Sequence, residues 1–430
     1  MTTTININML TKKLLILLAG TVIQGPSFAQ ERTVTAPNSR IDVPAETLAP
    51  NDKSSFSFEG VYKADYLRVT SGGLRRGGET MGHLDLKLSI NLDKGLGWQN
   101  TTAFVNFLHD HGGEINTNHV GSLLGVSNIE VPVDTDRFFQ AWLQKSWHED
   151  RFSVLAGLYP IDTEFQVVES ASLFLQPPYG PTADLSLTRG PSIFNNPAVG
   201  IRVRWRSEHR GIYIQGAALD GIPGDPAHPK GTHIKFAKGD GTMSIVELGH
   251  NRADVRTEEN NANPGMQKFA IGYWQYSSKA DDLVDVDANG DPVKRRSHGV
   301  YALSESSLWQ GADDFDLRGF ARIGATDGYS TPIQRVISVG FTINAPFASR
   351  PVDTFGVAYT YARMGDRFRT AQQVAGVTAT AYESAWELTY RLMASSWFAV
   401  QPSIQYFRNP GADASIRSAK VAGMRAEFSF

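Results

Sequence analysis

Arginine recurs at every second position in the segment VGIRVRWRSEHRGIYIQGA, which covers residues 199–217. Arg202, Arg204 and Arg206 alternate there with apolar residues. A guanidinium group carries five N–H donors in a rigid planar fork, so such a row can bind carboxylates or polar solutes. Strict alternation is the pattern of a β-strand with one polar and one apolar face. The chemistry of the row therefore depends on what the polar face meets.

Other segments with the same alternation place more charged and aromatic residues on one face. Counting inward from the predicted strand ends puts one set of charges near mid-depth: Lys63, Asp85, Lys87, Arg202, Arg204, Arg318, Arg322, Glu387 and Arg425. Phe138 and Trp142 share the parity of Gln140 and Gln144, so we expect both rings on the polar face. The charged side chains could instead form ion pairs with one another and serve only to keep the polar face of the strands hydrated. The alternative for the rings is packing or lipid contact, since alternation is weak in their strand.

Period-two segments follow one another from residue 56 to the C-terminus. We predict about sixteen strands, starting near residues 55, 79, 96, 135, 150, 197, 210, 242, 266, 297, 313, 332, 352, 382, 397 and 419. Their connections alternate in length. Short ones are predicted at 93–97, 148–150, 207–210, 310–314 and 395–396, and long ones at 110–134, 160–196, 220–241, 279–296 and 365–381. The stretch 252–265 is too long for its place in this order.

This layout distinguishes two all-β architectures. A soluble sandwich has no reason to gather short turns at one end and long loops at the other. A transmembrane antiparallel β-barrel has short periplasmic turns, long external loops, an even strand number, an apolar outer face and a polar lumen. Closure also pairs every backbone polar group within the bilayer. The sequence therefore predicts an outer-membrane barrel of the porin type, with the apolar stripe against lipid and the arginines in a water-filled pore.

Bulk composition and the N-terminus agree with that location. Lys12 and Lys13 precede an apolar stretch that ends in SFA at residue 29, which predicts a signal peptide over 1–29. We expect a polar, proline-containing periplasmic lead-in over 30–54 and the barrel over 55–430. The 430 residues contain no Cys and have a net charge of −3. This excludes a zinc–cysteine or disulfide framework and a globally basic nucleic-acid binder. The predicted location is the outer membrane of a Gram-negative bacterium.

Two loop segments contain groups of possible metal ligands. Asp285, Asp287, Asn289 and Gly290 match the start of a calcium loop, but Arg296 stands where a bidentate Glu is required. The segment 109–119 holds three histidines and a glutamate without orienting partners. We therefore expect no metal and no cofactor. G-x-S-x-G, P-loop and H-E-x-x-H motifs are absent from the sequence, so we expect no enzyme and no catalytic residue.

The chain ends in Phe430, the last residue of an amphipathic segment. A C-terminal aromatic residue on such a strand is the usual signal that the outer-membrane assembly machinery reads. We expect that machinery and the outer-membrane lipids to be partners of this chain. The sequence does not distinguish a monomer from a homo-trimer, because lipid-facing and subunit-facing strands look alike.

Segments spread over the chain resemble the OprB-like carbohydrate-selective porins. They are FFQAWLQKSWHEDRFSVLAGLYPIDTEF (138–165), PSIFNNPAVGIRVRWR (191–206), GVYALSESSLWQ (299–310), RPVDTFGVAY (350–359) and QPSIQYFRNPG (401–411). The resemblance implies a sixteen-stranded barrel that passes glucose and other sugars by diffusion. It also implies that the charges and the two rings line a sugar path, where guanidinium and carboxylate groups would bind hydroxyls.

This chain departs from the family pattern in two loops. The 160–196 loop contains SLFLQPPYGPT, and the 220–241 loop is rich in Pro, Gly and His. A general diffusion porin, a barrel enzyme and a receptor remain as alternative functions. The sequence also leaves open which sugar passes, whether loop 160–196 folds into the pore, and whether external loops bind metal.

Overall fold

The structure is a computed structural model that describes residues 5–6, 54–208, 210–252 and 265–430. The predicted signal peptide and lead-in therefore lie almost entirely outside the described residues, as does most of the stretch 252–265. Only β1 (Ile5–Asn6) is described in the N-terminal part, and it pairs with β9 (His233–Ile234). Within the described residues, no helix is both long and apolar enough to cross a bilayer.

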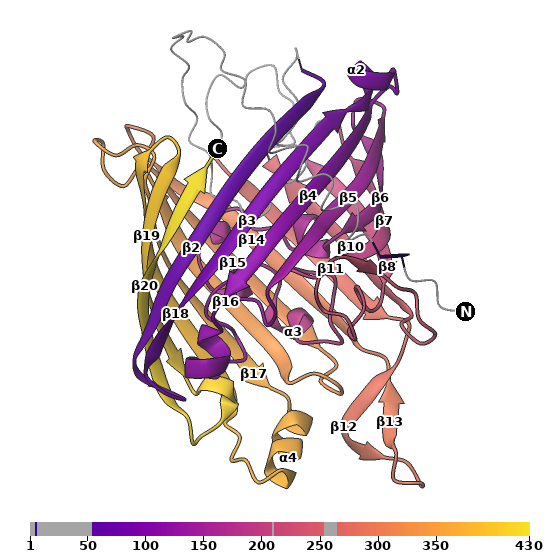
Figure 1. Ribbon diagram of the computed structural model, residues 1–430, viewed down its shortest axis with the longest axis vertical. Coiled ribbons are helices and arrows are strands. Elements are labelled where there is room, and N and C mark those ends of the chain that lie inside the picture. The colour runs from indigo at the N-terminus through magenta and orange to yellow at the C-terminus, as the bar shows by residue number, and fades with distance from the viewer. Residues whose placement is uncertain (1–4, 7–53, 209, 253–264) are drawn as a thin grey trace.

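Sixteen antiparallel strands close into one barrel, as the sequence predicts (Figure 1). Each strand pairs with its neighbours in chain order, and β2 pairs with β20 to complete the ring. The strands are β2 (Phe56–Gly73), β3 (Gly77–Asn91), β4 (Thr101–Gly112), β5 (Thr135–Trp147), β6 (Phe152–Tyr159), β7 (Ala198–Arg206), β8 (Ile212–Asp220), β10 (Thr242–Asn251), β11 (Gln267–Tyr276), β14 (His298–Gln310), β15 (Asp316–Thr326), β16 (Ile333–Asn344), β17 (Thr354–Met364), β18 (Tyr382–Ser395), β19 (Phe398–Arg408) and β20 (Arg417–Ser429).

The predicted short connections lie at one end of the barrel and the predicted long loops at the other (Figure 1). At the short-turn end, α2 (Leu92–Leu96) occupies the point where a strand was predicted to start, so β4 begins five residues later than expected. Asn91 caps this helix by accepting the N–H groups of Asp93 and Lys94, and Gly97 ends it with φ 73°. These local signals favour a helical turn over an early strand.

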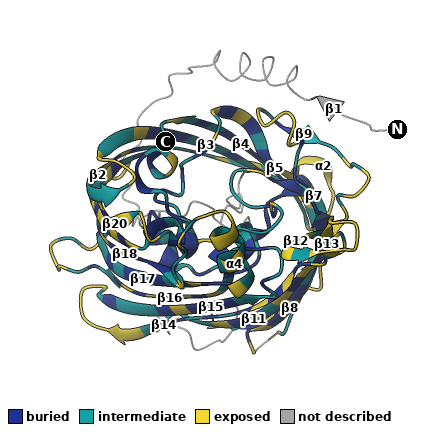
Figure 2. Ribbon diagram, turned by 90° about the horizontal axis from the view of Figure 1, so that it is seen from below, coloured by how far each residue is buried: buried dark blue, intermediate teal, exposed yellow. Residues whose placement is uncertain are grey.

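The long-loop end carries its own secondary structure. The hairpin β12 (Ala280–Val286) and β13 (Pro292–Arg295) lies beside α4 (Asp366–Val374). Figure 2 views this end and shows α4 in front of the barrel opening. The short 3-10 helix η7 (Pro410–Ala412) connects β19 and β20 at the same end.

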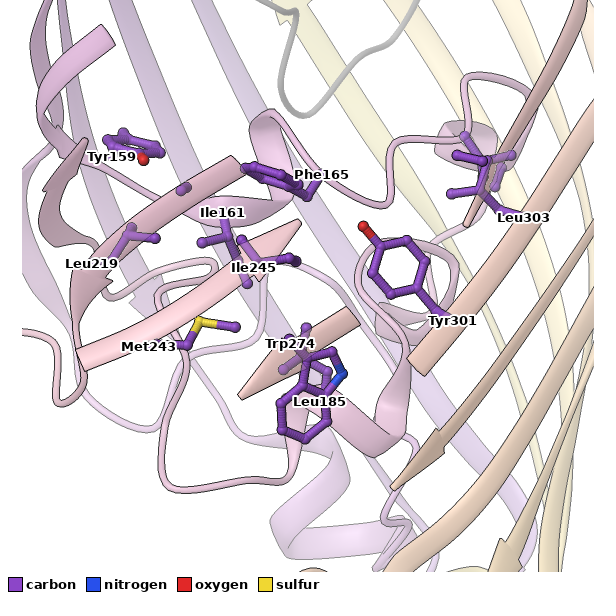
Figure 3. Close-up of a cluster of buried hydrophobic side chains, with 14 of the residues drawn as sticks. Tyr159, Ile161, Phe165, Leu185, Leu219, Met243, Ile245, Trp274, Tyr301 and Leu303 are labelled. Atoms are coloured by element: carbon purple, nitrogen blue, oxygen red, sulfur yellow. The ribbon is translucent and has the colours of Figure 1, made fainter. Parts of the chain in front are cut away.

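Two loops fold into the lumen instead of extending outward. The connection 113–134 contains η2 (Asn116–Val120). The connection 160–197 contains four short helices: η3 (Ile161–Thr163), η4 (Ser170–Leu173), η5 (Pro177–Tyr179) and α3 (Ala183–Ser186). The apolar residues of the second connection pack against inward side chains of the wall strands (Figure 3). Phe165 and Leu185 from the loop belong to the same buried cluster as Trp274 and Tyr301 from the wall. The core of this barrel is therefore formed by its own loops.

Candidate functional site

Carboxylates on the inner wall hold the longer inward loop by its backbone. Glu305 on β14 accepts the N–H groups of Glu169 and Ser170 at 3.0 and 2.9 Å. Glu387 on β18 accepts those of Leu175 and Gln176 at 2.8 and 3.0 Å. A charged acceptor makes a hydrogen bond stronger than a neutral one. Each glutamate thus fixes two consecutive residues of a loop that has no strand to pair with.

Two further glutamates act in the same way. Glu247 on β10 accepts the N–H of Gln166 at 3.0 Å and the hydroxyl of Tyr301 at 2.7 Å. Glu383 on β18 holds the other inward loop, because it accepts the Leu123 N–H at 3.0 Å and the Ser122 hydroxyl. Glu247, Glu305 and Glu383 are absent from the predicted site. Glu383 shares its face of β18 with the predicted Glu387, so parity could have identified it, whereas Glu247 and Glu305 share their faces with apolar residues such as Ile245 and Leu303.

The arginine row faces the lumen, where a loop carboxylate binds two of its members. Arg202 donates from Nε to Glu164 at 3.1 Å, and Arg204 donates from Nη2 to the same Glu164 oxygen at 2.6 Å. Arg202 also donates to Ser153 and Gln144, both at 2.6 Å. The side chain of Arg202 is 1% exposed, so it is a packed wall group. Glu164 was not among the predicted site residues.

Two other predicted arginines also contact the inward loops. Arg425 forms a two-pronged ion pair with Asp65 at 2.7 and 2.9 Å and donates to Asn128 at 2.7 Å. Arg322 is fully buried and donates to the carbonyl oxygens of Tyr179 at 2.7 Å and Gln166 at 3.2 Å. These arginines connect wall strands to both loops.

The predicted charges on β2 and β3 form a separate inner cluster. Lys87 pairs with Asp85 at 2.8 Å, and Asn106 donates to Asp85 at 2.5 Å. Lys63 is buried, and its Cα neighbours on the adjacent strands are His83 and Glu427. Acids and bases thus alternate around this part of the wall.

Arg318 and Phe138 differ from the expected placement, whereas Trp142 faces inward as predicted but is buried. Arg318 lies at the third position of β15, near the short-turn end instead of mid-depth, and pairs with Asp316 at 2.6 Å. Trp142 does face inward, but its ring is 5% exposed and stacks on Phe104 at 5.0 Å. Phe138 does not face inward.

A register shift in β5 changes the face of Phe138. Asn106 on β4 pairs with Gln140, whereas the next residue, Phe107, pairs with Phe138. Between these two pairs β4 advances by one residue and β5 by two. Phe139 is therefore the extra residue of a β-bulge. Phe139 is buried inside the barrel, and Phe138 contacts Phe107 on the opposite face, with 5.7 Å between ring centroids. The prediction that Phe138 shares the face of Trp142 is wrong, because parity counting cannot detect an extra residue.

A cavity lies between the two inward loops. One loop contributes Ser127, Asn128 and Glu130. The other contributes the remaining lining residues: Asp162, Gln166, Val167, Val168, Ala171, Ser172, Phe174, Pro177, Tyr179, Gly180, Pro181, Ser186, Ile193 and Phe194. Carboxylate, amide and hydroxyl groups thus stand beside aromatic rings. Phe194 is partly exposed. Its ring forms T-shaped pairs with His83 and Phe139, with 5.5 and 5.9 Å between ring centroids.

Burial shifts the ionisation of two carboxyl groups on these loops. It raises the pKa of Glu130 to about 7, although the Asn116 N–H that Glu130 accepts at 2.9 Å acts in the opposite direction. It raises the pKa of Asp184 on α3 to about 6. Removal from water disfavours the charged form of a carboxyl group. The charge of the cavity lining therefore changes near neutral pH.

The histidine-rich segment does not converge on one point. His109 pairs with Asp136 at 2.6 Å, whereas His119 pairs with Glu79 at 3.0 Å. In the external hairpin, Asp285 pairs with Arg295 at 2.7 Å and with Arg367 at 2.8 Å. Among the described residues, no group of three or more His, Cys, Asp or Glu side chains is placed to hold a metal ion.

Comparison with known proteins gives a consistent result. Residues 75–430 match the family of carbohydrate-selective porins named OprB. Porin B of Pseudomonas aeruginosa is 22% identical over 416 residues, which cover 86% of this chain and 87% of that protein. The high-pH structure of Pseudomonas putida OprB aligns with a TM-score of 0.76 at 17% identity, covering 87% of this chain and 94% of the other. The outer membrane channel DcaP of Acinetobacter baumannii aligns at 0.51 and 10% identity, covering 87% and 97%.

The solved structures share the barrel fold, and the family match spans β3 to the C-terminus. A closed ring of sixteen strands, an apolar outer face and a lumen narrowed by loops are what an outer-membrane channel requires. This protein is a channel and not an enzyme, it is located in the Gram-negative outer membrane, and it belongs to the OprB family of carbohydrate-selective porins.

Proposed function

We propose that the protein passes glucose-like sugars by passive diffusion and selects them in the cavity between its two inward loops. The observation that supports this proposal is the lining of that cavity. Asn128, Gln166 and Ser172 offer amide and hydroxyl groups there, and Phe194 offers a partly exposed ring. A pyranose has hydroxyls around its edge and an apolar face of C–H groups, so it needs both kinds of surface at one place.

The charged side chains of the lumen wall affect the water through which an uncharged solute diffuses. We propose that the alternating charges of the lumen order water along the path while most of their hydrogen-bonding capacity is used by protein groups. The Arg202–Glu164–Arg204 group and the Asp85–Lys87 pair support this, because opposite charges neighbour one another. A lumen lined mainly by charges of one sign would instead concentrate ions of the opposite sign in the pore. In this proposal the arginines shape the pore, and the loop residues contact the sugar.

The proposal assigns the stacking role to Phe194. The rings of Trp142 and Phe104 stack on each other, and Phe138 lies on the opposite face of its strand. The rings of Phe174 and Tyr179 also belong to the cavity, but both are almost fully buried and their centroids are 4.9 Å apart. Phe194 is therefore the aromatic residue of this lining with the most surface to offer a passing sugar.

Planar-bilayer recording of the full chain tests this function. Glucose, other monosaccharides and disaccharides would be added in turn, and sugar-dependent block and noise of the ion current would be measured. We expect block by glucose-sized sugars and at least several-fold weaker block in Phe194→Ala. Phe347→Ala is the matched control, because Phe347 is 59% exposed in the connection between β16 and β17. An open pore whose current no sugar affects would identify a general diffusion porin instead.

A further inference from the structure

The membrane-facing side of six neighbouring strands has an uneven distribution of charge. These strands are β16, β17, β18, β19, β20 and β2, which follow one another around the barrel. Their outward positions alternate with buried lumen positions, and the structure describes all of them. No Asp or Glu occupies an outward position on any of the six. The charged residues found there are all basic and all exposed; we call them the basic arc: Arg335, Arg363, Arg408, Lys420 and Arg68.

The basic arc lies in the half of the barrel wall nearer the long-loop end. Arg335 is the third residue of β16, Arg363 is the next to last of β17, and Arg408 is the last of β19, so all three stand at the long-loop end. The next outward residue on the membrane side is Tyr361 for Arg363, Tyr406 for Arg408 and Tyr66 for Arg68, and β18 carries Trp386 on the same face. Such a belt marks the boundary between hydrocarbon and headgroups. The arc therefore lies at headgroup level in the external leaflet.

The members of the arc are close neighbours. Arg335 and Arg363 are direct cross-strand partners. Tyr382 is the partner of Arg363 on the other side, and the guanidinium of Arg408 lies 5.6 Å from the centroid of the Tyr382 ring. Lys420 pairs with Tyr406 on the next strand. Like charges directly opposite each other destabilise a sheet, so this row requires a counter-charge.

The described residues do not supply that counter-charge. None of the five basic residues forms an ion pair with a described residue. Asp366, the carboxylate that begins α4 close to Arg363, already pairs with Arg369. Elsewhere on the outer face the pattern differs, because β4 and β5 carry the mutual pair His109–Asp136. This surface therefore has room for an anion from outside the described chain.

We propose that the basic arc binds the phosphate groups of the phosphorylated glycolipid that forms the external leaflet of the Gram-negative outer membrane. Guanidinium groups bind phosphate through paired N–H donors, and two of them on adjacent strands can share one phosphate. The acyl chains of the same lipid would lie along the apolar outward residues below, such as Ile337 and Val339, which are exposed. The site is separate from the sugar path, and it orients and anchors the barrel.

Binding of bisphosphorylated lipid A to the detergent-purified full chain tests the site. The variant Arg335→Gln with Arg363→Gln removes the directly paired charges, and Lys230→Gln with Lys238→Gln removes two exposed charges from the 221–241 loop as the matched control. Each basic residue near a charged surface changes affinity about fivefold, so we expect about 25-fold weaker binding for the first variant and little change for the control. Equal binding by both variants and the unmodified chain would overturn the proposal.

Additional binding measurements identify the ligand, and two controls check that each variant is folded. Dephosphorylated lipid A should bind no better to the unmodified chain than to the Arg335/Arg363 variant, and millimolar inorganic phosphate should compete only weakly. Strong competition by free phosphate would show a simple anion site and contradict the lipid assignment. A heat-modifiable band and unchanged sugar block confirm that a variant is folded. If Arg335→Gln with Arg363→Gln does not assemble, Arg408→Gln with Lys420→Gln tests the same arc.

Discussion

The Glu164 carboxylate lies between the guanidinium groups of Arg202 and Arg204 on the lumen wall. Removing these arginines should therefore change the charge of the lumen. The double change Arg202→Ala with Arg204→Ala leaves the Glu164 charge without its partners in a narrow channel. We expect the reversal potential in a salt gradient to move toward cation preference. Added salt should weaken this effect, since the screening length is about 10 Å at 0.1 M.

The same change should also loosen the loop that carries Glu164. Breaking a buried ion pair by removing one side costs about 3–5 kcal/mol, which is enough to release the loop locally while the barrel stays closed. Arg151→Ala is the control, because its ion pair with Glu208 is about half exposed at a turn. An unchanged reversal potential in a folded double variant would mean that Glu164 is neutralised by other groups.

Glu130 gives the lumen a response to pH. Burial raises its pKa to about 7, so the carboxyl group is largely neutral at pH 6 and largely charged at pH 8. Deprotonation adds a negative charge to the cavity lining, and we therefore expect cation preference to increase as the pH rises through 7. The measurement is the reversal potential between pH 6 and 8. Glu130→Gln should remove this step, and a step that persists in that variant would belong to another group.

At the scale of the strand, the outward apolar row has a direct energetic test. Leu388 lies at the seventh position of β18 and is 42% exposed on the outer face. An arginine near the bilayer midplane of a barrel costs about 2–4 kcal/mol, so Leu388→Arg should reduce assembly in the outer membrane. Leu96→Arg is the matched control, because Leu96 is exposed in the α2 turn outside the barrel wall. Equal assembly yields would contradict the face assignment of β18.

The external hairpin and α4 form a second testable element. Arg295 and Arg367 each bridge Asp282 and Asp285, with distances of 2.5–2.8 Å, and both guanidinium groups lie over the Tyr329 ring. Arg367→Ala should free α4 from the hairpin, which limited proteolysis within 366–374 would detect while the barrel remains protected. Arg369→Ala is the control within the same helix. Equal cleavage of both variants would show that α4 is held by other contacts.

Acid should open the same contact. Burial would raise the pKa of Asp282, but the N–H groups of Asp285 and Val284 and the guanidinium of Arg295 outweigh it and lower the pKa to about 2. A carboxylate with a depressed pKa stabilises the folded form above its unfolded value of about 3.9. That stabilisation is lost as the pH falls through about 2, so α4 should become cleavable only in this acidic range.

The strands could be predicted from the sequence because alternation is a local signal. The inward folding of the two loops could not be predicted in this way. A residue such as Leu86 or Arg202 shows its face through its immediate neighbours, and all sixteen predicted starts lie within about five residues of the observed ones. The inward course of loop 160–197 depends on Glu247, Glu305 and Glu387, which come from strands far along the chain. The bulge at Phe139 also has no local signature. Contacts of high sequence separation and single inserted residues are therefore what parity counting misses.

At the scale of the whole molecule, the ring must close between its first and last strands. β2 and β20 pair along most of their length, and the backbone of Phe430 exchanges two hydrogen bonds with Gly60, both at 2.9 Å. Full pairing leaves no edge in the bilayer. We expect the unboiled protein to run as a compact band in mild detergent gels and to shift after boiling. Identical mobility before and after boiling would contradict a closed barrel in solution.

Phe430 combines this closing contact with the proposed assembly signal. Its side chain is 66% exposed, and its ring lies over Gly60, where an added Cβ would come within 2.3 Å of the ring. Deleting Phe430 removes both backbone bonds to Gly60 and the exposed ring, so we expect a lower outer-membrane yield with normal export to the periplasm. Phe430→Ala keeps the backbone pairing and removes only the ring. If the two variants lose yield equally, the ring acts through the assembly machinery; if only the deletion loses yield, strand closure accounts for the whole effect and the proposed signal is wrong.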